Sequence, residues 1–189
     1  FMTVGLGIKL ALFPLHVWLP NAYAYAPSVS SAFLAATATK VSIYVLVRVF
    51  FTIFGPDYSF ETMPLDVVLL PLAVTAMFVG SLVAIFQDDV KRMLAYSSVA
   101  QIGYMIVGIC LASVIGLTGG LLHLFNHALM KGALFLAMGC VVYRLGSAML
   151  DDLSGLGRRM PWTMAAFVVG GLSLIGIPLT AGFVSKWYL

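Results

Sequence analysis

The stretch Gly119–Leu136 reads GGLLHLFNHALMKGALFL, and it decides the fold because it sets three basic side chains in an apolar run of helical length. His123, His127 and Lys131 recur every four residues, and helical pitch places residues at that spacing on one face. A charged side chain at the bilayer centre costs about 2.5–3.5 kcal/mol on insertion scales, so such residues normally face a protein interior or water. We therefore predict a membrane-spanning helix that carries an ion path.

Composition supports a membrane protein over the whole chain. Apolar residues make up 62% and charged residues 9%, against roughly 25% charged residues in a soluble domain. Long apolar segments, without short alternating strands, predict an all-α, polytopic transmembrane helix bundle. The net charge of +3 gives no reason to expect a nucleic-acid partner, and Cys110 and Cys140 lack the spacing of a metal or disulfide site.

Both ends of the chain lie in apolar sequence, at Phe1 and Leu189, without a cleavable signal pattern. We therefore expect a fragment: one transmembrane domain over 1–189 that belongs to a longer polypeptide. At about 20 apolar residues per crossing, six spans are predicted. They are expected at 1–24, 28–54, 64–87, 93–112, 114–143 and 161–189. Because proline lacks the helical N–H donor, Pro14 and Pro20 should interrupt the first span and Pro178 the sixth.

Alternating these spans across the bilayer sorts the basic loop residues onto one side. That side holds Lys91, Arg92, Arg144, Arg158 and Arg159. The other side offers only Arg48, so the first side is predicted to be cytoplasmic, in a bacterial or archaeal cell membrane.

Four lysines lie within the predicted spans, whereas the only acidic residue there is Asp66, at the start of the third. The lysines are Lys9, Lys40, Lys131 and Lys186. Desolvation disfavours a charged ammonium group, so these side chains should be partly neutral, hydrated, or paired with acids from other segments. Each of these states suits proton transfer, although Lys186 has the alternative of snorkelling to the interface.

Lys40 lies near the middle of its span, with Thr37 three residues before it and Tyr44 four residues after. These two hydroxyl groups share its helical face, and we expect them to complete its hydrogen bonding.

Several interpretations remain for the histidines of the fifth span. Their spacing of about 6 Å suits a water-bridged proton relay. A buried imidazole bonded to a neighbouring oxygen is the simpler alternative. A zinc site lacks a third ligand, so no metal is expected. Haem would need His16 to supply the opposite axial ligand, and we expect no cofactor.

The two interrupted spans each carry a lysine. Lys9 precedes Pro14 by five residues, and Lys186 follows Pro178 by eight. Transporters commonly place ion sites at discontinuous helices in matching positions of two repeats. An ordinary proline kink is the alternative, but the paired lysines favour a functional break.

Four segments, in chain order, resemble the antiporter-like subunits of respiratory complex I, Mrp-type sodium/proton antiporters and membrane-bound hydrogenases. They read KLALFPLHVWLPNAYAYAPSVSSAFLAATATKVSIYVLVR, DDVKRMLAYSSVAQIGYM, HLFNHALMKGALFL and GIPLTAGFVSKWYL. The resemblance implies a larger bundle built from two inverted repeats, with 1–54 ending the first repeat and 64–189 forming most of the second.

By the same resemblance, Lys9 matches the broken-helix lysine of a first half-channel and Lys40 the connecting residue. Lys131 matches the lysine of a second half-channel, flanked by His123 and His127, and Lys186 the terminal lysine. The glutamate that partners the first lysine in the family would lie upstream.

The segments MKGALFLAMG and LTAGFVSKWYL most resemble the D-type member of the Mrp antiporters, and they resemble complex I subunits almost as much. Leu34 and Lys40 depart from the pattern of the largest complex I subunit. We therefore expect a proton-translocating subunit of a multisubunit Na⁺/H⁺ antiporter, with other membrane subunits and lipid as partners. A complex I or hydrogenase subunit, a haem-binding redox subunit and a structural anchor with vestigial charges are the alternatives. No flavin, iron-sulfur or quinone motif is present, so any redox chemistry would belong to the assembly.

Overall fold

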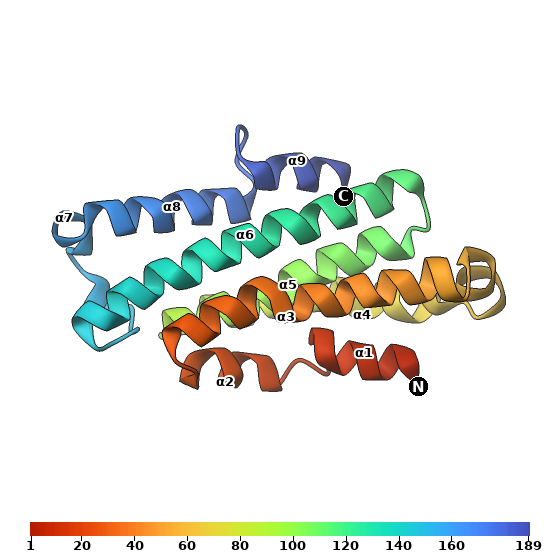
Figure 1. Cartoon of the computed structure of the whole chain (residues 1–189), viewed down its shortest axis with the longest axis horizontal. Coiled ribbons are helices and arrows are strands. Elements are labelled where there is room, and N and C mark those ends of the chain that lie inside the picture. The colour runs from red at the N-terminus through yellow and green to blue at the C-terminus, as the bar shows by residue number, and fades with distance from the viewer.

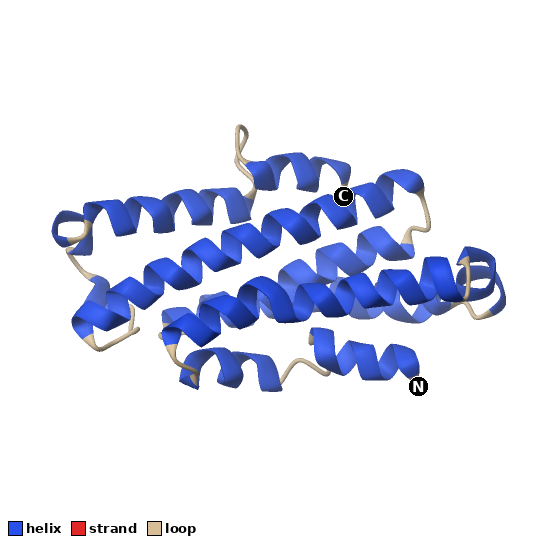
Figure 2. Cartoon of the chain, in the orientation of Figure 1, coloured by secondary structure: helices blue, strands red, loops and turns tan.

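The computed structural model describes residues 1–189 as a bundle of helices without strands (Figure 1; Figure 2). The α-helices are α1 (Met2–Leu10), α2 (Trp18–Tyr25), α3 (Ser28–Val47), α4 (Leu65–Ile85), α5 (Val90–Cys110), α6 (Val114–Leu145), α7 (Leu156–Arg159), α8 (Pro161–Ile175) and α9 (Ala181–Tyr188). Two π-helical segments, Arg48–Ile53 and Asp57–Thr62, follow α3, and one 3-10 turn lies at Asp151–Leu153. The predicted all-α class is confirmed.

Four helical segments are long and apolar enough to cross a membrane: Ser28–Ile53, α4, α5 and α6. The first and sixth predicted spans are each divided into two shorter helices, α1 with α2 and α8 with α9. The long helix α6 packs against α3 and α5 on one side and against α8 and α9 on the other (Figure 1). Helix α5 also contacts α4 and α2, so α5 and α6 position most of the interior.

Polar and proline residues define the helix starts. The carboxylate of Asp89 accepts a hydrogen bond from the backbone N–H of Arg92 at 3.0 Å, so α5 begins three residues earlier than the sequence predicts. The hydroxyl of Ser113 caps α6 in the same way, at 3.0 Å from the Gly116 nitrogen. Pro161 occupies the first position of α8, where its missing N–H is not needed.

Each divided span breaks at one place. The first breaks between Leu10 and Trp18, around Pro14, as predicted. Pro20, however, lies inside α2 and does not interrupt it. That prediction was wrong because the third residue of a helix has no intrahelical acceptor for its N–H, so a proline there removes no bond. The second break follows Gly176, whose φ of 91° ends α8, and contains Pro178 as predicted.

Two apolar clusters fill the bundle, one toward each end. On α5 the first cluster reaches Val99 and the second begins at Ile102. On α3 the first cluster ends at Ala35 and the second resumes at Ile43, with Lys40 between them. Lys40 therefore lies at mid-depth, between the two apolar clusters.

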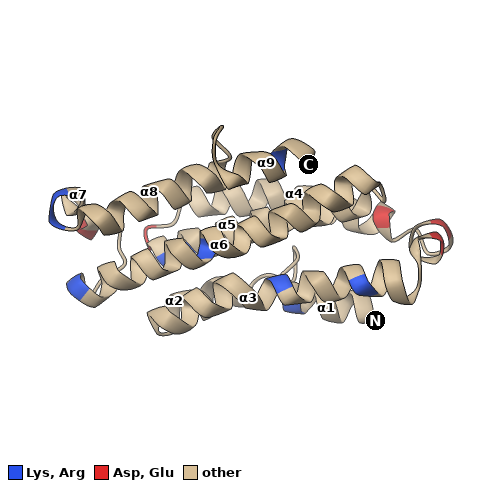
Figure 3. Cartoon of the chain, turned by 45° about the horizontal axis from the view of Figure 1, so that its top comes forward, with Lys and Arg blue, Asp and Glu red and all other residues tan.

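Charged side chains also mark the ends of the bundle. In Figure 3 the acidic positions lie at the two ends, whereas basic positions also occur along the length of the bundle. The beginning of α5 and the segment after α6 meet at one end, where the Val90 nitrogen donates to the Ala148 carbonyl oxygen at 2.9 Å. The five basic loop residues therefore share that end, as predicted.

Candidate functional site

The site begins with the basic face of α6. The side chains of His123, His127 and Lys131 are completely buried, with 0% of their surface exposed. The two imidazole rings stack, with centroids 5.9 Å apart and an interplanar angle of 11°. The predicted alignment on one helical face is therefore confirmed.

Lys131 is held by neutral oxygens on α5. Its Nζ donates to the Leu94 carbonyl oxygen at 2.6 Å and to the hydroxyl oxygen of Ser97. An ammonium group has three donors and a neutral amine has fewer, so these two acceptors fit either protonation state. Since neither acceptor carries a formal charge, neither fixes the proton on the lysine.

His123 links three helices. Its Nε2 lies 2.8 Å from Oε1 of Gln101 on α5, and its Nδ1 lies 3.0 Å from Oγ of Ser185 on α9. A carboxamide oxygen can only accept, so Nε2 carries the hydrogen and Nδ1 of the neutral ring accepts from the serine hydroxyl. Ser185 Oγ also lies 3.1 Å from the Gly182 carbonyl oxygen, to which the hydroxyl can donate instead. Protonation of Nδ1 would therefore require the Ser185 hydroxyl to turn from Nδ1 toward the Gly182 oxygen.

His127 differs from its neighbour because neither ring nitrogen has a protein hydrogen-bond partner, although both are buried. A buried polar group without such a partner costs about 1–3 kcal/mol, which makes it uncommon outside functional positions. The simple alternative of an imidazole satisfied by a neighbouring protein oxygen does not describe His127, whereas it does describe His123.

Lys40 is buried on α3, and its Nζ donates to the carbonyl oxygen of Ala35 on the same helix. The prediction that Thr37 and Tyr44 would bind it was wrong. The Thr37 hydroxyl donates to the Phe33 carbonyl oxygen at 2.8 Å, the usual back-bond of a helical threonine. The Tyr44 ring is half-exposed and its hydroxyl accepts from Arg48 at 3.3 Å.

Lys186 joins the site through an aromatic ring. Its Nζ lies 4.9 Å from the ring centroid of Tyr104, within the range of a cation–π interaction, and donates to the Ile175 carbonyl oxygen at 3.3 Å. The same Tyr104 ring lies 6.3 Å from the His123 ring. Lys186 is therefore linked to His123 through the Tyr104 ring.

The first broken span is less closely tied to this network. Lys9 is exposed at the end of α1. His16 lies in the break, stacked on Phe13 at 5.3 Å and edge-on to Tyr96 at 6.3 Å. Both nitrogens of His123 are already bound to Gln101 and Ser185, so His123 does not present a free ligand atom for haem. No group of three or more His, Cys, Asp or Glu side chains is placed to hold a metal ion.

Sequence reasoning missed the residues of α5 that face this line. Ser97, Gln101 and Tyr104 contact Lys131, His123 and Lys186, respectively. Their spacing of four and three residues places them on one helical face, so the segment YSSVAQIGY did contain a detectable polar stripe. Ser185 was missed as well, and its only signal was its position next to Lys186.

The fold and the site define a polytopic integral membrane protein with a buried basic line. The family described as "NADH:quinone oxidoreductase/Mrp antiporter, TM" matches residues 1–189, and the chain belongs to that family.

Similar proteins include NADH-quinone oxidoreductase subunit N of Desulforudis audaxviator, 49% identical over 100% of this chain and 37% of the relative. A Na⁺/H⁺ antiporter subunit of Alkalihalophilus pseudofirmus is 36% identical over 98% of this chain and 37% of the relative. A chain in the solved Mrp complex from Dietzia sp. DQ12-45-1b superposes with a TM-score of 0.92 at 36% identity, covering 98% of this chain and 34% of that one. The chain thus spans little more than a third of the length of these proteins.

Proposed function

We propose that this chain forms part of a proton-translocating membrane subunit, in which the α6 line and Lys40 pass protons through the middle of the bilayer. The observation that supports this most directly is the complete burial of Lys131 beside two buried histidines in a helix long enough to span the membrane. Lysines bonded only to neutral oxygens can lose and regain a proton without breaking an ion pair.

In this proposal each proton transfer changes the charge that neighbouring groups experience. Two unit charges 6 Å apart interact by about 3 kcal/mol at an effective dielectric constant of 20. Protonation of one group therefore favours release from the next. The Ser185 hydroxyl and the Gln101 carboxamide orient the ring of His123, so the path runs along the membrane plane, from α6 toward Lys186, as well as across the membrane.

Two assemblies are candidates, and in both the partners would be other membrane subunits. The 49% identity to a quinone oxidoreductase subunit, against 36% to an antiporter subunit, favours a proton pump driven by a redox arm. The resemblance at the fifth and sixth spans favours a sodium/proton antiporter in a bacterial or archaeal membrane. In either case we propose that 1–54 ends one inverted repeat and that 64–189 forms most of another. Each part contains one broken helix with a lysine: Lys9 precedes the break between α1 and α2, and Lys186 follows the break between α8 and α9.

The test is Lys131→Ala in the full-length protein within its assembled complex, reconstituted in vesicles that contain a pH-sensitive dye. Proton movement should be abolished, while Arg158→Ala, which removes an exposed cation at the end of the bundle, should leave it unchanged. Wild-type transport by an assembled Lys131→Ala complex would refute the relay and support a structural anchor. Sodium-dependent exchange would identify the antiporter, whereas movement that requires quinone reduction would identify the oxidoreductase. A Soret band in the purified protein would instead indicate haem.

A further inference from the structure

His123 and His127 share one face of α6, but their ring nitrogens meet different surroundings. Neither nitrogen of His127 has a protein hydrogen-bond partner, whereas both nitrogens of His123 do. The two partners are themselves buried, since Gln101 is 7% exposed and Ser185 is 0% exposed. Any proton that His123 gains or loses must therefore pass through a group that already binds it.

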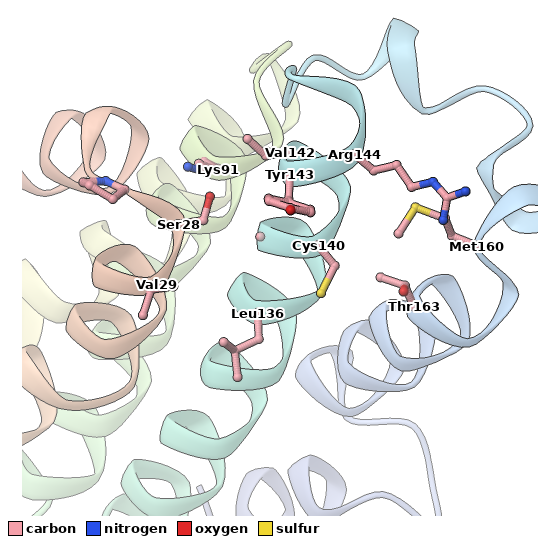
Figure 4. A pocket seen from close by; sticks show the side chains of 12 residues that line it. Ser28, Val29, Lys91, Leu136, Cys140, Val142, Tyr143, Arg144, Met160 and Thr163 are labelled. Atoms are coloured by element: carbon pink, nitrogen blue, oxygen red, sulfur yellow. The ribbon is translucent and has the colours of Figure 1, made fainter.

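The groove at the basic end of the bundle does not lead to this histidine. It has a volume of about 1370 Å³, and on α6 it is lined only from Leu136 onward (Figure 4). Leu136 lies thirteen residues after His123, which is about 20 Å along an α-helix. A proton therefore does not reach either nitrogen of His123 directly from that groove.

The two nitrogens of His123 are bound by groups of different chemistry. Nε2 lies 2.8 Å from the Gln101 carboxamide oxygen, which can only accept a hydrogen bond, so Nε2 keeps its hydrogen there. Nδ1 lies 3.0 Å from the Ser185 hydroxyl, which can both donate and accept. Nδ1 is therefore the position at which the protonation state of His123 can change.

The Ser185 hydroxyl can bind Nδ1 in both protonation states. It donates to Nδ1 of the neutral ring, and it accepts from Nδ1 once that nitrogen is protonated. In the second state its own hydrogen turns to the Gly182 carbonyl oxygen, 3.1 Å away. Gln101 accepts from Nε2 in both states. The buried imidazole therefore keeps two hydrogen bonds throughout, and no heavy atom has to move.

We propose that Gln101 and Ser185 are positioning residues that make His123 exchange its proton at Nδ1 alone, through the Ser185 hydroxyl. This inference rests on the proposed proton path. When a hydronium ion or a lysine ammonium group gives a proton to Ser185 Oγ, the hydroxyl passes its own hydrogen to Nδ1. The hydroxyl is restored, the donor is left as water or a neutral amine, and His123 becomes an imidazolium ion.

The charges around His123 favour exchange on the side of α9. The titratable groups that surround it are His127 on α6, Tyr104 on α5, Lys186 on α9 and Lys40 on α3. An imidazolium ion at His123 and an ammonium group at Lys186 would repel each other. Transfer of the Lys186 proton through Ser185 removes that repulsion, because only one of the two groups is then charged.

The first experiment reads the position of the hydrogen on His123. It uses the full-length protein in its reconstituted complex, with ¹⁵N-labelled histidine and solid-state NMR, and His123→Gln identifies the signals of this ring. In the wild type the neutral ring should carry its hydrogen on Nε2. Gln101→Met has a side chain of similar length without the acceptor, and should move the hydrogen to Nδ1, where Ser185 accepts it. A purely structural role of Gln101 would not change the tautomer.

The second experiment is dye-monitored proton uptake at equal amounts of assembled complex. Ser185→Ala should slow uptake about tenfold, because Nδ1 loses its only hydrogen-bond partner. Its His123 hydrogen should stay on Nε2, since Gln101 is intact. Ser42→Ala is the matched control: Ser42 is also a buried helical serine, but its hydroxyl donates only to the Ala38 carbonyl oxygen of its own helix, at 3.1 Å. Uptake by this control should be unchanged.

Three results would each overturn the inference: a hydrogen on Nδ1 in the wild type, an unchanged tautomer in Gln101→Met, or wild-type uptake by Ser185→Ala. Lys131→Ala distinguishes this failure from failure of the proton path. If Lys131→Ala blocks uptake and Ser185→Ala does not, the path stands without exchange through Ser185. If neither variant slows uptake, the proton path itself is refuted and this inference falls with it.

Discussion

Gly182→Ala is expected to disconnect α9 from the histidine network. Gly182 packs against the backbone of α8, where its nitrogen lies 3.2 Å from Oγ of Ser173. A methyl group at position 182 would overlap the Ser173 carbonyl oxygen and lie 2.8 Å from the carbonyl carbon. Carbon atoms in favourable contact stay about 3.5–4.0 Å apart, and the overlap with the oxygen is larger still, so α9 must move by more than about 1 Å.

That movement is large enough to affect the site three residues later. It would lengthen the separation of Ser185 Oγ and His123 Nδ1 from 3.0 Å to about 4 Å, beyond hydrogen-bonding range. Overpacking of this kind costs about 1–3 kcal/mol. A penalty of about 2 kcal/mol would make the docked arrangement about 30-fold less populated. We expect proton uptake to fall at least tenfold.

The assay is dye-monitored proton uptake by the full-length protein in its reconstituted complex, together with thermal unfolding in detergent. Gly171→Ala is the matched control, because a methyl group there meets no atom within 4 Å. Alanine is also the better helix former, by up to about 1 kcal/mol, so this control should transport normally with an equal or higher Tm. If Gly182→Ala transported protons at the wild-type rate with an unchanged Tm, α9 would not be held by this contact and the reasoning would be wrong.

Two further predictions concern α5. Ser97→Ala removes one of the two acceptors of Lys131 and should slow proton uptake several-fold. Ser98→Ala is the control, because the Ser98 hydroxyl bonds only the Leu94 carbonyl oxygen, and it should not slow proton uptake. Equal rates in the two variants would contradict a role for the Ser97 hydroxyl. Asp89→Ala removes the N-cap of α5 and should cost about 1 kcal/mol, measured as a lower Tm, while Asp88→Ala should unfold like the wild type.

The local features of this fold follow from sequence patterns, because they depend on residues close together in the chain. The basic face of α6 follows from the four-residue spacing of His123, His127 and Lys131. The break at Pro178 follows from the backbone N–H that proline lacks. The partners of His123 depend on how α5 and α9 pack against α6, and no periodicity within one helix specifies that. The error at Thr37 has the same origin, since a helical threonine bonds its own helix before it can reach a neighbouring lysine.

The two broken helices expose similar backbone groups but satisfy them differently. Ending a helix leaves carbonyl oxygens without the intrahelical donor they would otherwise have, and in a bilayer these oxygens need another partner. After α8 the Ile175 oxygen accepts from the ammonium group of Lys186, whereas at the end of α1 the Ile8 oxygen accepts from the indole N–H of Trp18 at 2.8 Å. An indole donor cannot release its proton near neutral pH, but a lysine can. The second break therefore places a titratable group on the freed carbonyl, and that group also contacts Tyr104 beside His123, while the first break holds its carbonyl with a fixed donor. Of the two breaks, the one between α8 and α9 is therefore the one that we expect to take part in the proposed proton path.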